Sequence, residues 1–345
     1  MNRIIREDME YVTKAEFIPW EKVDGKTVFI TGATGLIGYY LTASLLLRKA
    51  GIHVIVLTRN IESAKKRFAD FQGVFDEELI FLEGTMEEFP HIIDDVEYIV
   101  HGASPTASEE FALHPVETIE SIVEGCRNIL KLAKEKKVKG MIYLSSMEVY
   151  GVVHSHELVD ENHPICLDIT NPRNSYPISK MLCENLCAGY SREYKVDVKI
   201  ARLTQTFGPG IRKDDRRVFA YFLERCRNGE DIVLLTEGKT HRSYLYLADA
   251  ATAIFVMMLK GDSGNAYNAA NKNTYCSIRE LAELAIETVS EKKNRVRVDV
   301  KKTQAMKFME EHYMNLDTRK LQNLGWNPKF DLAEMLVRTV AGQES

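Results

Sequence analysis

Short apolar runs rich in β-branched residues alternate with longer helical patterns through residues 27–201. Runs of this length are typical of strands buried on both faces, and helices between successive strands require parallel βαβ units with right-handed crossovers. We therefore predict an α/β fold built on a Rossmann-type doubly wound parallel sheet. The predicted strands are residues 27–31, 53–57, 79–82, 97–100, 141–144 and 196–201, and the predicted helices are 36–49, 62–71, 116–136 and 179–193.

The pattern changes after Gly208-Pro209-Gly210, where shorter elements are interrupted by Gly, Pro and charged residues. The chain of 345 residues is also longer than a typical single domain of about 100–200 residues. We therefore predict a smaller C-terminal substrate-binding domain. The predicted division is an N-terminal extension (1–25), a dinucleotide-binding Rossmann domain (26–205 plus about 243–272) and a substrate-binding domain (206–242 and 273–345).

Composition excludes several classes of partner. A net charge of −5 argues against a broad nucleic-acid surface, which depends on neutralising phosphates. No apolar run approaches the roughly 20 residues that span a bilayer, and the N-terminus lacks the apolar core of a secretion signal. Six scattered cysteines without a C-x-x-C pair indicate free thiols in a reducing cytoplasm. The residues His154, His156, His163 and Cys166 fit no compact zinc spacing, so we predict no metal site.

A glycine-rich loop joins the first predicted strand to the first predicted helix. Gly32, Gly35 and Gly38 have the spacing G-x-x-G-x-x-G. In this context the glycines permit a tight turn, close approach of a pyrophosphate and close helix packing, and the helix N-terminus attracts the anion. We predict that a dinucleotide contacts this loop through its glycines and through Thr34, Leu36 and Ile37.

The end of the second predicted strand bears on the form of the cofactor. An acid at this point binds the ribose 2′-hydroxyl of NAD, whereas an arginine accommodates the 2′-phosphate of NADP. This chain has Thr58 and Arg59 there and no acid. Arg59 favours NADP by charge, but stacking on the adenine or simple exposure to solvent explains it nearly as well. The prediction is therefore NAD or NADP, with Thr58 and Arg59 at the adenosine.

A tyrosine and a lysine four residues apart begin the helix that follows the fifth predicted strand. Tyr176 and Lys180 share one helix face, and an ammonium close to a phenol favours the phenolate. Tyr176 could then remove a hydroxyl proton while hydride leaves for a nicotinamide. The fifth strand ends at Ser146 and Glu148, where ligands sit in open α/β sheets. We predict Ser146, Glu148, Tyr176 and Lys180 as catalytic residues.

These motifs resemble the extended short-chain dehydrogenase/reductases of the nucleotide-sugar epimerase/dehydratase family, and most closely its UDP-glucuronate decarboxylase-like members. The matching stretches are TGATGLIG at 31–38, HGASPTASEEFALHPVETI at 101–119, SSMEVYG at 145–151, YPISK at 176–180, TFGPG at 206–210, HRSYLYLADAATA at 241–253, AYNAAN at 266–271 and LGWNPKFDL at 324–332.

The resemblance implies further site residues and partners. It places Gly102, Ala103, Ser145 and Leu203 beside the cofactor together with Tyr176 and Lys180, and it places Ser104, Thr106, Gln205, Arg217 and Arg242 beside a nucleotide-diphosphate sugar. It also implies a homodimer formed through a bundle of helices 116–136 and 179–193, and it suggests a role in making polysaccharide precursors.

The implied activity is transient oxidation at sugar carbon 4, leading to decarboxylation or epimerisation, with a UDP-sugar favoured. Met147 stands where dehydratases of the family have an aspartate that donates a proton, which weakens 4,6-dehydration. Glu148 matches the acid of both dehydratases and decarboxylases. The alternatives are an NADPH-dependent 4-keto-sugar reductase, a 4,6-dehydratase, or a dinucleotide-binding regulatory or scaffold protein without catalysis.

Overall fold

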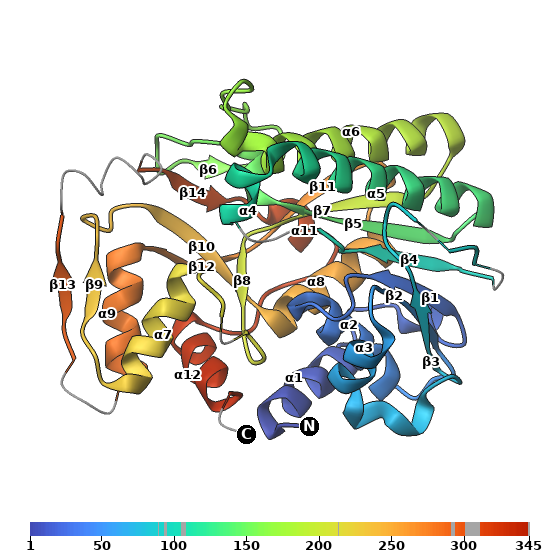
Figure 1. The fold of residues 1–345 in the computed structure, drawn as a ribbon, viewed down its shortest axis with the longest axis horizontal. Coiled ribbons are helices and arrows are strands. Elements are labelled where there is room, and N and C mark those ends of the chain that lie inside the picture. Colours follow the sequence, from blue (N-terminus) through green and yellow to red (C-terminus); the bar gives the residue numbers. More distant parts are fainter. Residues whose placement is uncertain are drawn as a thin grey trace.

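A seven-stranded parallel sheet forms the centre of the larger of two lobes (Figure 1). The computed structural model describes residues 1–88, 90–92, 95–104, 108–212, 214–290, 294–300 and 311–343, and of residues 108–110 it describes only the backbone. The strand order is β11-β7-β5-β4-β1-β2-β3. The strands are β1 (Thr27–Thr31), β2 (His53–Thr58), β3 (Leu79–Glu83), β4 (Tyr98–His101), β5 (Gly140–Ser146), β7 (Val198–Leu203) and β11 (Ala266–Ala269).

Helices cover both faces of this sheet (Figure 1). α2 (Leu36–Leu47) and α8 (Leu247–Lys260) lie on one face, and α5 (Pro115–Lys136) and α6 (Ser175–Tyr194) lie on the other. Alternate strand residues divide between the two cores: Val28 and Ile30 pack toward α2 and α8, whereas Phe29 packs toward α5 and α6. This alternation is the two-residue period of a strand buried on both faces. The predicted doubly wound α/β fold is confirmed.

Two predicted helices have different bounds in the structure. The helix predicted for 62–71 ends early, as α3 (Ile61–Arg67), and continues as the 3-10 helix η2 (Ala69–Val74). Phe68 leaves helical geometry between them, with φ −102° and ψ 23°. The helix predicted to start at 179 begins one turn earlier, because Pro177 lies in the first turn, where its missing N–H breaks no helical hydrogen bond. Tyr176 is therefore helical. Two short elements complete this side of the lobe, α4 (Ser108–Leu113) and η4 (Pro172–Asn174).

The smaller lobe is built on a sheet of order β12-β10-β14-β6, with β8 paired to β10, and on a separate pair, β13-β9. Its strands are β6 (Leu158–Val159), β8 (Gln205–Phe207), β9 (Ile232–Leu234), β10 (His241–Tyr246), β12 (Asn271–Ser277), β13 (Val296–Val298) and β14 (Tyr313–Leu316). Its helices are α7 (Val218–Asn228), α9 (Ile278–Val289), α11 (Arg319–Gln322) and α12 (Leu332–Ala341). β8 continues directly from β7 of the larger lobe and pairs with β10, so the two lobes are joined at the ends of these strands.

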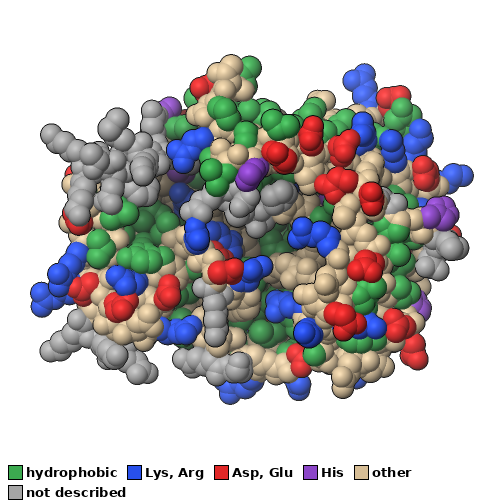
Figure 2. Space-filling model, in the orientation of Figure 1, with side chains coloured by type: hydrophobic (Ala, Val, Ile, Leu, Met, Phe, Trp, Pro, Cys, Tyr) green, Lys and Arg blue, Asp and Glu red, His purple; other side chains and the backbone are tan. Residues whose placement is uncertain are grey.

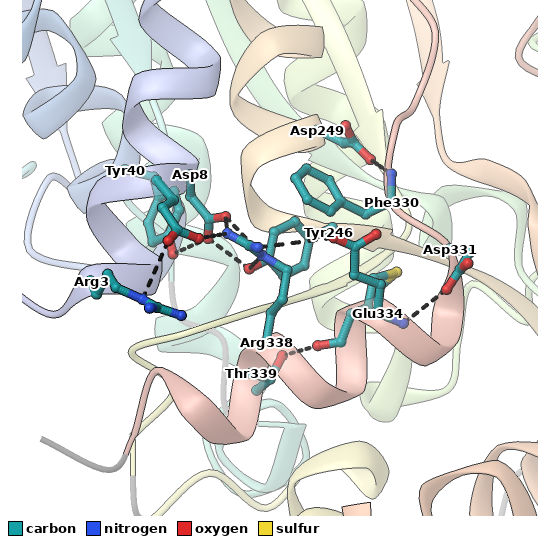
Figure 3. A network of polar contacts seen from close by, with 12 residues as sticks. Arg3, Asp8, Tyr40, Tyr246, Asp249, Phe330, Asp331, Glu334, Arg338 and Thr339 are labelled. Carbon is teal, nitrogen blue, oxygen red and sulfur yellow. Dashed lines mark hydrogen bonds and ion pairs between the residues drawn. The ribbon is translucent and has the colours of Figure 1, made fainter. Parts of the chain in front are cut away.

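The N-terminal segment packs on the larger lobe and also contacts the end of the chain. Its elements are α1 (Arg3–Thr13) and the 3-10 helix η1 (Trp20–Lys22). Asp8 of α1 is fully buried and accepts hydrogen bonds from the hydroxyls of Tyr40 on α2 (3.0 Å) and Tyr246 on β10 (2.6 Å). Arg338 of α12 donates to the same carboxylate at 2.7 Å (Figure 3). One buried carboxylate therefore joins four elements that are far apart in the sequence.

Candidate active site

The glycine loop lies between β1 and α2, as predicted. Gly32 has φ +74°, and a Cβ there would lie 2.8 Å from backbone atoms of Gly102 and Ala103, so a side chain is excluded. A Cβ on Gly38 would collide with the backbone of Gly32 and Ala33. Gly35 is the N-cap of α2 and is exposed. The first amides of α2 have no partner within the helix, so this exposed helix start suits an anionic diphosphate.

A buried hydrogen-bond cluster ties the glycine loop to the end of β4. The Thr31 hydroxyl accepts from the backbone N–H groups of Gly102 (3.2 Å) and Ala103 (3.1 Å), and it lies 2.8 Å from Nδ1 of His101. Its own proton is then available to Nδ1, which requires a neutral imidazole. Burial lowers the pKa of His101 to about 3, and the charge of Lys180 acts in the same direction. The two predicted cofactor-binding segments are therefore held in a fixed relation.

The predicted catalytic side chains meet at the end of β5. The Ser146 hydroxyl accepts from the Glu148 amide at 3.2 Å, and it lies near enough to the Tyr176 phenol to lower the pKa of that phenol. Burial raises the pKa of Tyr176, the nearby charge of Glu148 raises it further, and the Ser146 hydrogen bond lowers it. The ring of Phe111 on α4 stacks on the Tyr176 ring, with centroids 4.5 Å apart and planes 6° from parallel. The phenol is therefore fixed with its hydroxyl toward Ser146.

Lys180 lies beneath the phenol as a buried cation. Its Nζ donates to the Leu144 carbonyl at 2.8 Å and lies 5.6 Å from the centroid of the Tyr176 ring and 4.8 Å from that of Tyr143. Burial lowers the pKa of Lys180 to about 8. The arrangement brings an ammonium close to the phenol, as the Y-x-x-x-K spacing predicts.

Glu148 and Arg242 face the same region from different lobes. Glu148 is exposed to solvent although it lies deep among protein atoms, which is the position of a side chain lining a cleft. Burial raises the pKa of Glu148, and the charges of Arg242 and Lys180 lower it. Arg242 approaches His312 at 3.4 Å, and its Nε is buried with no hydrogen-bond partner among the described residues. The rest of the guanidinium is half-buried, and its charge suits an anionic ligand.

The other predicted substrate residues lie in different settings. Arg217 is paired with Asp215 at 2.6 Å and donates to the Thr206 carbonyl at 3.2 Å, so much of its guanidinium is already engaged. Gln205 begins β8 and is half-buried, as is Ser104 beyond β4. Thr106 lies outside the described residues. Figure 2 shows Lys and Arg side chains gathered near the middle of this face, where the lobes meet. A cationic region there attracts phosphate groups.

The predicted adenosine residues follow β2. The Thr58 hydroxyl donates to the Asn60 carbonyl at 3.1 Å, so it is used in the local turn before α3. Arg59 is exposed and lies within electrostatic reach of Glu87. Leu203 is buried at the end of β7. Neither cofactor form is selected by this geometry.

Three contacts in the site were not predicted from the sequence. Ser145, predicted beside the cofactor, is buried, and its hydroxyl donates to Glu184 at 2.6 Å. Met147 packs into a small core, with its sulfur 3.2 Å from the Thr204 hydroxyl, so it is turned away from the reacting groups. Phe111 covers the catalytic ring. The spacing of Glu184, four residues after Lys180, is the one signal that could have indicated a shared helix face.

Comparisons with known proteins identify the family of this chain. Residues 28–270 match the NAD dependent epimerase/dehydratase family. The chain belongs to this family. A relative with a known activity is UDP-glucuronic acid decarboxylase 1 of Xenopus tropicalis, which is 26% identical over 333 residues, covering 92% of this chain and 72% of the relative.

Solved structures of the family share the fold. A UDP-glucose 4-epimerase of Thermotoga maritima, solved with UDP-glucose, superposes with a TM-score of 0.74 at 23% identity, covering 91% of this chain and 97% of the epimerase. A dTDP-glucose 4,6-dehydratase of Bacillus anthracis in complex with NAD gives a TM-score of 0.74 at 20% identity, covering 92% and 96%. Among the described residues, no three His, Cys, Asp or Glu side chains form a group that could hold a metal ion. None of the described helices is long and apolar enough to cross a membrane.

Proposed function

We propose that this protein modifies a nucleotide-diphosphate sugar, with UDP-sugars favoured, through transient oxidation at sugar carbon 4. The observation that carries the proposal is the convergence of Ser146, Tyr176 and Lys180 at the end of β5, beside the glycine loop. A protein that only binds a dinucleotide has no need of a phenol, a hydroxyl and an ammonium at this point. The family relatives that act on UDP-glucuronic acid and UDP-glucose support the choice of substrate class.

Each catalytic residue has a distinct role in the proposed reaction. Tyr176 accepts the proton of the sugar hydroxyl, and Ser146 holds that hydroxyl by a hydrogen bond. An oxidised nicotinamide, when bound, would supply the hydride acceptor. Burial raises the pKa of Tyr176. The Lys180 ammonium, 5.6 Å from the centroid of the Tyr176 ring, favours the phenolate. Glu148 is the second acid or base, and burial raises its pKa, which favours its protonated form more than in an ordinary glutamate.

Decarboxylation or epimerisation fits the site better than 4,6-dehydration. Met147 is buried against Thr204 and carries no proton to donate to a leaving hydroxyl. The positive charge of Arg242 acts on Glu148, so it would also attract a sugar carboxylate or a diphosphate oxygen placed there. The remaining predicted contacts are proposals as well: Thr34, Leu36, Ile37 and Gly102 for the cofactor, and Ser104, Gln205 and Arg217 for the substrate.

The cofactor proposed is NAD or NADP, held at the start of α2. Arg59 is exposed and would contact the 2′-phosphate of NADP. The nearby Glu87 carboxylate would repel that phosphate, which supports NAD. We also propose a homodimer through α5 and α6, because their outer surface exposes Val116 (60%) and Leu182 (46%). Apolar side chains this exposed on adjoining helices favour burial against a second copy.

The purified protein should be incubated with UDP-, dTDP-, GDP- and CDP-sugars, including UDP-glucuronic acid, and the products analysed by mass spectrometry and chromatography. Loss of carbon dioxide identifies a decarboxylase, loss of water a dehydratase, and a changed retention at unchanged mass an epimerase. Stoichiometric consumption of added NADPH instead identifies a reductase. Absence of turnover across the panel would exclude the enzymatic proposal and leave a binding protein.

Tyr176→Phe tests the catalytic assignment. We expect this variant to lose turnover while still binding NAD, because only the proton acceptor is removed. Tyr194→Phe is the matched control, since Tyr194 is an exposed tyrosine on the same helix. Turnover in Tyr176→Phe equal to that of the control contradicts the role of Tyr176.

A further inference from the structure

The carboxylate of Glu184 is buried one helical turn beyond Lys180 on α6. Its Oε1 accepts the Ser145 hydroxyl at 2.6 Å and Nε of Arg202 on β7 at 3.1 Å, and its Oε2 accepts Nη2 of the same arginine at 2.7 Å. The two charged side chains are only 9% and 12% exposed. A bidentate, largely buried pair that accepts a further hydroxyl has little freedom to move.

Two neighbouring residues of β5 are held by two side chains one turn apart on α6. Lys180 donates to the carbonyl of Leu144, and Glu184 accepts the hydroxyl of Ser145. The next residue of the strand is Ser146, whose hydroxyl lies near the Tyr176 phenol in the first turn of the same helix. The distance between phenol and serine hydroxyl therefore depends on how firmly α6 is fixed to the end of β5.

Arg202 extends this clamp to the remaining elements around the site. It is the cross-strand partner of Ser145 in the β5–β7 register, so both residues reach Glu184 from one face of the sheet. Its Nη1 donates to the Tyr150 hydroxyl at 2.9 Å, and that hydroxyl donates to Asn268 on β11 at 2.7 Å. Tyr150 closes the short turn that carries Glu148. One carboxylate thus links the helix, both strands and the turn that present the reacting groups.

We propose that Glu184 is a positioning residue for the reaction proposed above, setting the geometry of Ser146, Tyr176 and Lys180 through its bonds to Ser145 and Arg202 and holding Lys180 in its charged form. It touches neither of the proposed ligands and acts only through these neighbours.

The charge of Glu184 also acts on Lys180. Burial lowers the pKa of Lys180 to about 8, and the Glu184 carboxylate raises it. The other titratable groups facing Lys180 come from α6, α5, β5, β4 and the turn after β5, and they are Tyr176, Cys183, Cys187, Cys126, Tyr143, His101 and Glu148. Glu148 is exposed, whereas Glu184 is buried against Ser145 and Arg202. Removal of the Glu184 charge takes a negative charge away from Lys180 and leaves the positive charge of Arg202 without its partner. Both changes favour loss of the Lys180 proton.

The test compares Glu184→Gln with Glu184→Asp and with Glu193→Gln, an exposed acid on the same helix. Glu184→Gln should lower kcat by up to roughly 100-fold, as misplacement of reacting groups by about 1 Å does. It should also move the alkaline limb of the kcat profile about one pH unit toward lower pH, because a nearby opposite charge has been lost. Glu184→Asp keeps the charge but not the reach, so it should lower kcat while leaving that limb in place. Glu193→Gln should match the unmodified protein in both measurements.

A second measurement is independent of turnover. In protein labelled with carbon-13 lysine, the Lys180 signal is identified by its loss in Lys180→Arg and titrated by NMR. Glu184→Gln should lower the Lys180 pKa, whereas Glu193→Gln should not. If the unmodified protein turns over no nucleotide sugar, the proposed function fails but this titration still decides the effect of Glu184 on Lys180.

Two results would overturn the inference. One is a Glu184→Gln variant that loses thermal stability but keeps the kcat profile and the Lys180 titration of the unmodified protein, since Glu184 would then serve folding alone. The other is full kcat in Glu184→Asp. If Glu184→Gln does not fold, Ser145→Ala keeps the Glu184–Arg202 pair, and it must lower kcat without moving the alkaline limb.

Discussion

Replacement of Arg338 by methionine should be among the most destabilising single changes in this protein. Asp8 is 0% exposed and has one cationic partner among the described residues, Arg338, at 2.7 Å. Methionine retains most of the apolar stem but leaves the carboxylate with only the Tyr40 and Tyr246 hydroxyls. Breaking a buried ion pair by removing one partner costs about 3–5 kcal/mol. Since a whole domain is stable by about 5–15 kcal/mol, this is a large fraction of the total.

The chain offers a matched control in Arg212→Met. Arg212 pairs with Asp214 at the same distance of 2.7 Å, but those side chains are 82% and 68% exposed. Water already solvates both charges there, so no measurable loss of stability is expected. The free energy of unfolding is measured by urea denaturation, followed by the fluorescence of Trp20 and Trp326, which are both buried.

A pH series sharpens the test. Burial raises the pKa of Asp8, while the Tyr246 hydrogen bond and the charge of Arg338 lower it. Without Arg338 the pKa of Asp8 in the folded state rises further above its value in the unfolded state. The variant therefore keeps the stability contributed by Asp8 at low pH and loses it as pH rises through the folded-state pKa. The deficit of Arg338→Met should therefore shrink between pH 7 and pH 5. An Arg338→Met variant no less stable than Arg212→Met at pH 7, or a deficit that grows toward pH 5, would refute the reasoning.

Two other predictions concern a buried acid and the proposed dimer. Burial raises the pKa of Asp249 to about 7, so its contribution to stability is full below pH 4 and lost as pH rises through about 7. The stability of the unmodified protein minus that of Asp249→Asn should fall between pH 5 and pH 8 in urea titrations, and a constant difference would contradict this pKa. Leu182→Glu should give a monomer by light scattering. Ile169→Glu, which changes an exposed residue outside α5 and α6, should leave the dimer intact. A stable dimer in both variants would place the interface away from α6.

Local patterns in the sequence predicted the frame of the larger lobe. Strand and helix periods depend on neighbouring residues, so β1 to β5 were found within a few residues. The glycine loop and the Y-x-x-x-K pair are also local, because Gly32 and Gly38 act within one turn and Tyr176 and Lys180 share one helix face. These features needed no knowledge of distant contacts.

The contacts that were missed join residues far apart in the chain. Glu184 on α6 pairs with Arg202 on β7, and Phe111 stacks on a tyrosine 65 positions later, so no spacing rule reaches either pair. Met147 was correctly read as unable to transfer a proton, but its burial against Thr204 follows from how β8 and β10 pack. The position of a helix end also depends on single residues, since α3 ends where Phe68 leaves helical geometry.

The bond between Asp8 and Arg338 also orders events during synthesis. It spans 330 positions, so the N-terminal helix, although made first, lacks its cationic partner until almost the whole chain has left the ribosome. Until then α1 carries an acid that belongs in the interior but has no counter-ion. Docking of α12 therefore completes the burial of α1, and a chain truncated before Arg338 leaves its own first helix without its anchor.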